Sequence, residues 1–412
     1  MNRSDFSLTD ARARYVQANA ATLRWILGRP RLAGAFLNTK VNSLSLTDYG
    51  DADGVRGPAY LYGWIQGRGL EAVATHAEFF ETEEPALVAE LDDAGFALYQ
   101  ALRDLQRRDG HGYFCYDGNL DPFYVSPDGM LHRQSAADQV FTYSDAFFAK
   151  GLIAGAARYA PADLPEHIAY LSEVIDSIEQ RRFQMDERCR LSPRTAMDEP
   201  EDFGPRMILL GAAGLLHRLE LSEHSAFADR FIAHVLESHF DPESGLLRNV
   251  PGTDACNVGH AIEFVGFALG HLRDSAEPAL VQQLRSVLIS SFTRGFINPG
   301  LCLSVSIATG NPLSPYCPWW SLPETIRSAA LCFAASGDGE ILRIWEQADD
   351  AFFTHYWRGS LAYQTLTWNG PIDFVPATPD LDPGYHTGLS LLAAIRVADW
   401  ILPRPIGAQV TM

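Results

Sequence analysis

The sequence lacks several features that would assign its 412 residues to a particular class of protein. No run of about 18 uninterrupted apolar residues occurs, so we expect no transmembrane helix. The first ten residues, MNRSDFSLTD, lack the apolar segment of a secretory signal. Cysteine is scarce, with six residues and no Cys-x-x-Cys pair, which favours reduced thiols in a cytoplasmic protein.

Basic residues are also few. The 32 lysines and arginines are outnumbered by 51 acidic residues, which gives a formal net charge of −19. A charge of this sign repels nucleic-acid phosphates and anionic membrane surfaces, so we expect neither as a partner. With 47% hydrophobic residues, the chain is rich enough in apolar side chains to fold as a globular protein.

Motifs for cofactors and metals are missing. The sequence has no G-x-x-x-x-G-K-[ST] loop, no G-x-G-x-x-G after a predicted strand and no H-E-x-x-H string. Its histidines and cysteines do not have the spacing of a zinc site. We therefore expect no cofactor and no bound metal.

Amphipathic helical segments make up most of the chain. Apolar periodicity and the punctuation by Gly, Pro, Asp and Asn predict twelve helices, near residues 9–27, 57–80, 85–107, 142–159, 163–183, 204–219, 223–239, 257–272, 277–294, 321–336, 339–356 and 385–400. Short loops join the second helix to the third, the fourth to the fifth, and so on, whereas most other connections are long. Short loops produce antiparallel neighbours. This alternation predicts an all-α fold, an (α/α)6 barrel of six hairpins in a single domain spanning residues 1–412.

The even-numbered helices are apolar on most faces, so we assign them to an inner ring. Residues that are unusual at a helix start gather at the beginnings of these helices: Arg56, Arg206, His260 with Glu263, Trp319 and Trp320 with Glu324, and His386. In a barrel, these positions face one open end of the axis. Helix N-termini add partial positive charge there, which can stabilise an anion that forms during a reaction.

Two histidines are the candidate acid–base groups. His260 and Glu263 are three residues apart and therefore share a helix face, where the carboxylate can orient the imidazole. His386 follows a Pro-Gly turn at the start of the last helix. The alternative for either histidine alone is a buried core residue. Two histidines at equivalent hairpin positions weaken that alternative, because both would face the same cavity.

The tryptophans and the other charged residues have alternatives too. Trp319 and Trp320 offer flat faces for a sugar ring, but they could instead pack in the core. Glu324 could line a site or close a capping box at the start of its own helix. Arg56 and Arg206 could bind an anion or form ion pairs with nearby aspartates.

Several strings resemble those of the N-acylglucosamine 2-epimerase family, and together they run from about residue 50 to about residue 400. They are Trp64-Ile-Gln-Gly-Arg68, Tyr143-Ser-x-x-Phe147, Gly204-Pro-Arg-Met-Ile208, Gly259-His260-x-x-Glu263, Trp319-Trp320-x-x-Pro323-Glu324 and Tyr385-His386. The resemblance implies the same (α/α)6 barrel and permits a homodimer. It also implies that His260 and His386 form the catalytic pair and that Arg56, Glu263, Trp320 and Glu324 line a sugar site. We add Arg206 and Trp319 as candidate substrate-binding residues.

The chemistry implied by this resemblance suits the residues. An open-chain sugar has a C–H bond beside its carbonyl, and a histidine can remove that proton to form an enediolate. Return of the proton to C1 gives a ketose, and return to the other face of C2 gives the epimer. The string from Trp320 to Glu324, with Arg327 after it, looks closer to the mannose isomerase branch. We therefore expect an enzyme that isomerises a monosaccharide, for example mannose to fructose.

Other functions stay open at this stage. One alternative is a 2-epimerase of an N-acylated or free sugar. Another is a glycoside hydrolase or lyase on the same fold, with Glu263 and Glu324 as its two carboxylates. A third is a carbohydrate-binding protein without catalytic activity.

Overall fold

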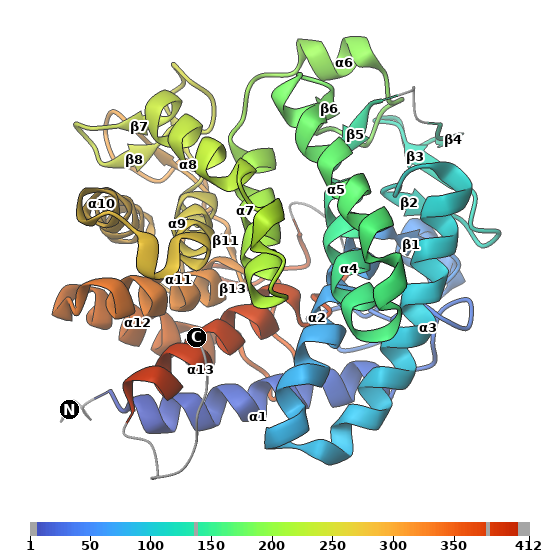
Figure 1. The fold of residues 1–412 in the computed structure, drawn as a ribbon, viewed down its shortest axis with the longest axis horizontal. Coiled ribbons are helices and arrows are strands. Elements are labelled where there is room, and N and C mark those ends of the chain that lie inside the picture. The colour runs from blue at the N-terminus through green and yellow to red at the C-terminus, as the bar shows by residue number, and fades with distance from the viewer. Residues whose placement is uncertain (1–5, 136–138, 376–379, 403–412) are drawn as a thin grey trace. The chain divides into compact units, whose positions relative to one another are not determined.

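The computed structural model describes residues 6–135, 139–375 and 380–402, and its helices dominate Figure 1. The chain divides into two compact units, which are described separately. The first unit comprises residues 1–22, 232–375 and 386–412, and the second comprises residues 23–231 and 376–385. Among the described residues, no helix is both long and apolar enough to cross a membrane.

Each helix predicted in the second unit overlaps an observed helix, although some of the ends differ, and one short helix was not predicted. They are α2 (Gly63–Glu83), α3 (Pro85–Asp109), α4 (Tyr143–Tyr159), α5 (Leu164–Glu179), the unpredicted α6 (Pro193–Asp198) and α7 (Gly204–Arg218). Helices α1 (Leu8–Leu27) and α8 (Phe227–Ser238) each run across a boundary between the units. Within the second unit, α2 packs against α3 and α4, and α4 packs against α5 and α7.

The first unit contains the remaining helices. They are α9 (Val258–Leu272), α10 (Pro278–Gly295), α11 (Ser321–Ser336), α12 (Gly339–Ala351) with a π-helical turn Phe352–Tyr356, and α13 (Ser390–Ile401). A π-helical turn, Tyr385–Leu389, precedes α13, and only its first residue, Tyr385, belongs to the second unit. Helix α11 packs against α9, α12 and α13. The side chain of Asn19 in α1 donates a hydrogen bond of 3.1 Å to the carbonyl of Gly388 and so ties the second π-helical turn to α1.

Strands are short and lie in the connections between helices. The second unit has a four-stranded sheet in the order β1-β2-β3-β4 and a parallel pair of β5 with β6. In the first unit, β7 pairs with β8, β9 pairs with β10, and β11, β12 and β13 form a sheet in that order. The bounds are β1 Leu61–Tyr62, β2 Cys115–Tyr116, β3 Pro122–Val125, β4 Leu131–Arg133, β5 Phe141–Thr142, β6 Phe183–Gln184, β7 Phe240–Asp241, β8 Leu246–Leu247, β9 Ala255–Cys256, β10 Val305–Ser306, β11 Cys317–Pro318, β12 Thr365–Thr367 and β13 Gly370–Pro371.

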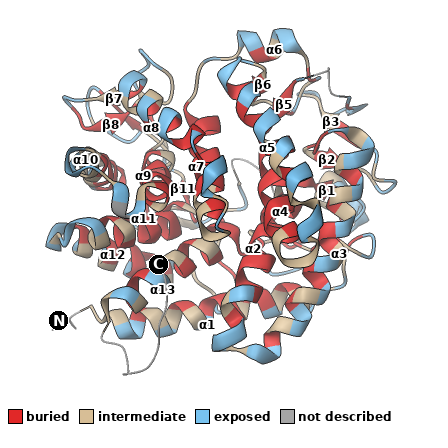
Figure 2. Cartoon of the chain, in the orientation of Figure 1, coloured by how far each residue is buried: buried red, intermediate tan, exposed pale blue. Residues whose placement is uncertain are grey.

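Burial separates the helices into two kinds (Figure 2). Helices α2, α4, α7, α9 and α11, all predicted to be inner helices, are buried over most of their length. Helices α3, α5, α10 and α12 bury one stripe and expose the rest. A helix that is apolar on most faces needs neighbours on most sides. The predicted difference between the two kinds of helix is therefore confirmed within each unit.

The predicted start of the second helix at residue 57 is wrong, and Arg56 therefore does not lie at the start of that helix. Residues 61–62 form β1, which pairs with β2, so the helix begins only at Gly63. Arg56 instead ends a 3-10 helix, Asp51–Arg56. Its guanidinium lies 4.3 Å from the centre of the Tyr49 ring and hydrogen-bonds the Tyr49 hydroxyl.

Two buried lysines hold the last segment of the second unit. Lys40 forms an ion pair of 3.0 Å with Asp380, and both side chains are 1% exposed. Lys150 lies 3.3 Å from the Glu71 carboxylate and also hydrogen-bonds the hydroxyl of Tyr385. Buried charges are costly unless they are paired. These pairs therefore fix the residues on either side of the Pro383-Gly384 turn.

Candidate active site

Three elements of the first unit supply the candidate side chains. At the start of α9, the Asn257 side chain caps the helix by accepting a hydrogen bond of 3.1 Å from the backbone N–H of His260. Glu263 follows one turn later in the same helix. Helix α11 carries Glu324 in its first turn, and the π-helical turn before α13 carries His386.

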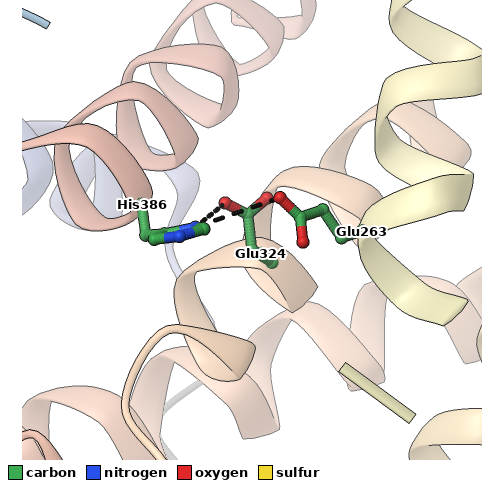
Figure 3. A group of neighbouring side chains, drawn as sticks. All are labelled: Glu263, Glu324 and His386. Carbon is green, nitrogen blue, oxygen red and sulfur yellow. Dashed lines mark hydrogen bonds and ion pairs between the residues drawn. The ribbon is translucent and has the colours of Figure 1, made fainter. Parts of the chain in front are cut away.

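Figure 3 shows the carboxylates of Glu263 and Glu324 side by side, with the imidazole of His386 facing them. The Nδ1 atom of His386 lies 2.9 Å from Oε1 of Glu324 and 4.0 Å from Oε1 of Glu263. None of the three residues is more than 6% exposed. Since an ionised carboxylate only accepts hydrogen bonds, Nδ1 carries the proton, and Nε2 is the basic nitrogen of the neutral ring.

Glu324 is ionised although it is completely buried. Burial acts to raise its pKa, but the Arg327 guanidinium, 2.9 Å from Oε2, and the hydrogen bond with His386 outweigh this effect and lower the pKa. The first turn of α11 therefore presents a permanent negative charge to the imidazole. This charge fixes the ring's tautomer and makes Nε2 a better base.

Trp320 contacts both histidines. Its ring centre lies 5.3 Å from that of His260 and 5.7 Å from that of His386, with interplanar angles of 34° and 35°. Trp319 is buried and meets His386 edge-on, with ring centres 6.1 Å apart. The half-buried Trp320 is thus the better candidate for stacking with a sugar, whereas the burial of Trp319 favours core packing.

The capping-box alternative for Glu324 does not describe the structure. Helix α11 begins at Ser321, whose hydroxyl donates a hydrogen bond of 2.7 Å to the carbonyl of Pro318. The Glu324 carboxylate contacts His386 and Arg327 instead. Its side chain therefore belongs to the charged cluster and not to the helix cap.

The same three side chains are a donor set that divalent cations can bind, since their ligand atoms all lie within 4.8 Å of one another. In the structure, however, one oxygen of Glu324 accepts a hydrogen bond from His386, and the other pairs with Arg327. A cation would have to displace both contacts. We therefore describe the cluster as a hydrogen-bonded acid–base array, and the predicted absence of a metal stays a prediction.

The predicted residues fall into two groups. His260, Glu263, Trp319, Trp320, Glu324 and His386 all belong to the first unit, where the contacts above connect Glu263, Glu324, both tryptophans and both histidines. Arg56 and Arg206 belong to the second unit. Arg206 pairs with Glu201 at 3.3 Å, and burial lowers its pKa. That both arginines bind the sugar stays a prediction.

Two features were not assigned from the sequence. Arg327 has no predicted role, although its position three residues after Glu324 is typical of an ion pair on one helix face, which the structure contains. In the second unit, Arg68 is 9% exposed, and its guanidinium lies 4.0 Å from the ring centre of Phe147 and 5.5 Å from that of Tyr385. Such stacking joins residues far apart in the chain and leaves no local pattern.

No family model and no curated protein matches the sequence. Solved structures do match over nearly the whole chain. A cellobiose 2-epimerase from Spirochaeta thermophila DSM 6192 has a TM-score of 0.70 at 15% identity, covering 96% of this chain and 98% of that one. A sugar epimerase from a ruminal bacterium has 0.68 at 14% identity, covering 95% and 99%. A D-mannose isomerase has 0.65 at 15% identity, covering 96% and 100%.

These likenesses confirm the predicted fold class. The chain is all-α and has the (α/α)6 barrel fold of these enzymes. At 14 to 15% identity the match carries the fold alone.

Proposed function

We propose that this protein is a sugar isomerase or epimerase that moves a proton at C1 and C2 of an open-chain monosaccharide. The observation that carries the proposal is the buried His386, whose Nδ1 is bonded to an ionised carboxylate and whose ring shares Trp320 with His260. Two imidazoles beside one half-buried indole suit a reaction that needs both a base and an acid on a small sugar.

The first chemical step is assigned to His386. Its Nδ1–H stays bonded to Glu324, so Nε2 takes the proton from C2 of the sugar and the ring becomes an imidazolium. The pair of electrons left on C2 moves to the carbonyl, which gives an enediolate. The negative charge of Glu324 stabilises the imidazolium, as the buried carboxylate does in other His–carboxylate pairs.

The second step decides the product. If a proton returns to C1 and the hydroxyl proton passes from O2 to O1, the product is a ketose. If His260 delivers a proton to the opposite face of C2, the product is the epimer. We favour aldose–ketose isomerisation, for example of mannose to fructose. Epimerisation of a free or N-acylated sugar at C2 is the alternative, and it uses the same two histidines. The likeness to both epimerase and isomerase structures supports isomerisation and epimerisation equally.

The test is a panel of monosaccharides incubated in D2O and followed by NMR. We expect one sugar to gain deuterium at C1 or C2 and to be converted. His260→Ala and His386→Ala should each lower the rate by roughly 100-fold or more, since positioned acid–base groups contribute about that much. The rate should be unchanged by EDTA. If neither substitution slows the exchange, the assignment of the two histidines is wrong.

A glycosidase is the less favoured candidate. Two carboxylates lie close enough to flank a glycosidic bond. The general acid of such an enzyme, however, needs a raised pKa, and that of Glu324 is lowered. Release of reducing ends from a disaccharide without deuterium uptake would favour a hydrolase, and sugar binding that survives both histidine substitutions without any turnover would favour a binding protein.

Several further expectations are part of the proposal and are open to test. The single domain, the homodimer and the cytoplasmic location stay predictions. Arg56, Arg206, Glu263, Trp319, Trp320 and Glu324 are proposed to bind the sugar.

A further inference from the structure

Arg327 lies beside the histidine cluster without reaching His386 itself. It follows Glu324 by one turn of α11, and it is 6% exposed. Its guanidinium lies 2.9 Å from Oε2 of Glu324 and 4.7 Å from the ring centre of Phe267 in α9. The contact with the carboxylate is an ion pair without a well-aligned hydrogen bond, so its main contribution is charge.

The packing of α9 against α11 makes room for this buried cation. A Cβ atom at Gly266 in α9 would lie 2.5 Å from the hydroxyl oxygen of Ser328, and 3.3 Å from Cδ of Arg327. A side chain at this position would crowd the contact between the two helices unless Ser328 and Arg327 moved. The aliphatic stem of Arg327 thereby packs against α9 while its charged end stays next to Glu324.

We propose that Arg327 is a positioning residue, whose positive charge holds Glu324 as the hydrogen-bond acceptor of His386 and so makes Nε2 the base. This inference rests on the proposed function only for its effect on turnover. Without a cation beside it, a fully buried carboxyl group tends to take up a proton. It could then donate to Nδ1, the imidazole proton would move to Nε2, and that nitrogen could no longer accept a proton from the sugar.

The other charged groups around the cluster do not replace Arg327. Glu263, on α9, lies 4.0 Å from the imidazole and brings a second carboxyl group to the cluster. His260 contacts Trp320, which also contacts His386. Loss of Arg327 would leave two carboxylates and a histidine together, an arrangement in which one carboxyl group is expected to become neutral.

The test compares Arg327→Met and Arg327→Lys with Arg285→Met. Arg285 lies in α10 of the same unit and pairs with Asp338, so it controls for the loss of an arginine–carboxylate pair elsewhere. The first measurement is NMR of the resting, full-length protein with ¹⁵N-labelled histidine, which reports the protonated nitrogen of each ring. We expect His386 to be protonated at Nδ1 in the wild type, in Arg327→Lys and in Arg285→Met, and to lose this state in Arg327→Met.

The second measurement is the pH dependence of kcat. Arg327→Met should lower kcat by about tenfold or more with a smaller effect on KM, since an opposite charge at this range changes a protonation equilibrium by roughly that factor. It should also move the acidic limb of the profile to higher pH. Arg327→Lys should restore most of the loss. Arg285→Met should leave the limb in place.

A double-mutant cycle keeps the proposal testable if Arg327→Met folds poorly. Glu324→Gln removes the partner's charge, so Glu324→Gln combined with Arg327→Gln should be no slower than Glu324→Gln alone, whereas Arg327→Gln alone should be slower than the wild type. An unchanged Nδ1 signal in Arg327→Met, or independent effects in the cycle, would overturn the role of Arg327. The NMR result needs no sugar, so a protein that shows the expected tautomers but no turnover would refute the proposed function and leave this inference standing.

Discussion

A buried carboxylate is costly unless its charge is balanced, and Glu324 and Glu187 meet this requirement in opposite ways. Glu324 has Arg327 beside it and stays ionised. Glu187, in the second unit, accepts hydrogen bonds from neutral groups, among them the Ser144 hydroxyl at 2.6 Å, the Ser144 backbone N–H at 3.1 Å and the Trp64 indole N–H at 2.7 Å. Burial raises the pKa of Glu187 to about 8, so its carboxyl group is mostly protonated at neutral pH.

This difference predicts how stability depends on pH. The folded protein binds the Glu187 proton more tightly than the unfolded chain, so the free energy of unfolding should fall as the pH rises from about 5 to about 8, by roughly 3–5 kcal/mol for this group. Glu187→Gln should remove that part of the slope. Urea unfolding at several pH values measures it, and equal slopes in the two proteins would contradict the assignment.

At this scale, sequence reasoning found residue types but not their partners. His260, Glu263, Trp320, Glu324 and His386 stood out because of their positions at helix starts, and the structure brings their side chains together. Buried pairs such as Lys150 with Glu71 were missed. Nothing in the local sequence indicates that a charged residue in one helix is neutralised by a residue in another helix.

At the scale of elements, close approach between helices depends on single glycines. Gly259 in α9 faces Trp320, and a Cβ atom there would lie 2.5 and 2.6 Å from two atoms of the indole ring. Near the other end of α9, a Cβ atom at Gly270 would meet nothing within 4 Å. The two positions therefore form a matched pair within one helix.

We expect Gly259→Ala to destabilise the protein by about 1–3 kcal/mol, because the added methyl group overpacks the contact with Trp320. It should also lower activity by displacing that ring. Gly270→Ala should stabilise the protein by up to about 1 kcal/mol, because alanine favours the helix. Urea midpoints measure both changes, and equal effects at the two positions would show that Trp320 does not limit the space at Gly259.

The starts of helices were predictable where local side-chain chemistry determines them. Asp338 accepts a hydrogen bond of 2.8 Å from the backbone N–H of Glu340, and α12 begins at Gly339, where a helix was predicted to start. The start of α2 was misplaced because Leu61 and Tyr62 pair with β2, a partner more than 50 residues away. The π-helical turn Tyr385–Leu389 was also read as ordinary helix, since its residues have no distinguishing periodicity.

At the scale of the whole molecule, the dominant feature is the net charge of −19. Excess charge of one sign destabilises a compact state through repulsion, and salt screens that repulsion. Raising NaCl from about 20 mM to about 500 mM at pH 8 should therefore raise Tm by a few degrees. Near pH 5, close to the isoelectric point, the same change should have little effect. A Tm that falls with salt at pH 8 would mean that local ion pairs outweigh the net charge.

The π-helical turn that carries His386 also limits how this protein can vary. A wider turn of this kind accommodates one residue more than an α-helix would over the same length. Deleting a single residue from positions 387–389 would let the segment relax into regular helix, and His386 would swing by about 100° around the axis. A protein with that deletion would retain its helices and its stability, but its imidazole would point in another direction. A gap of one residue at this place in a related sequence would therefore identify a protein that has the same fold without the proposed proton transfer.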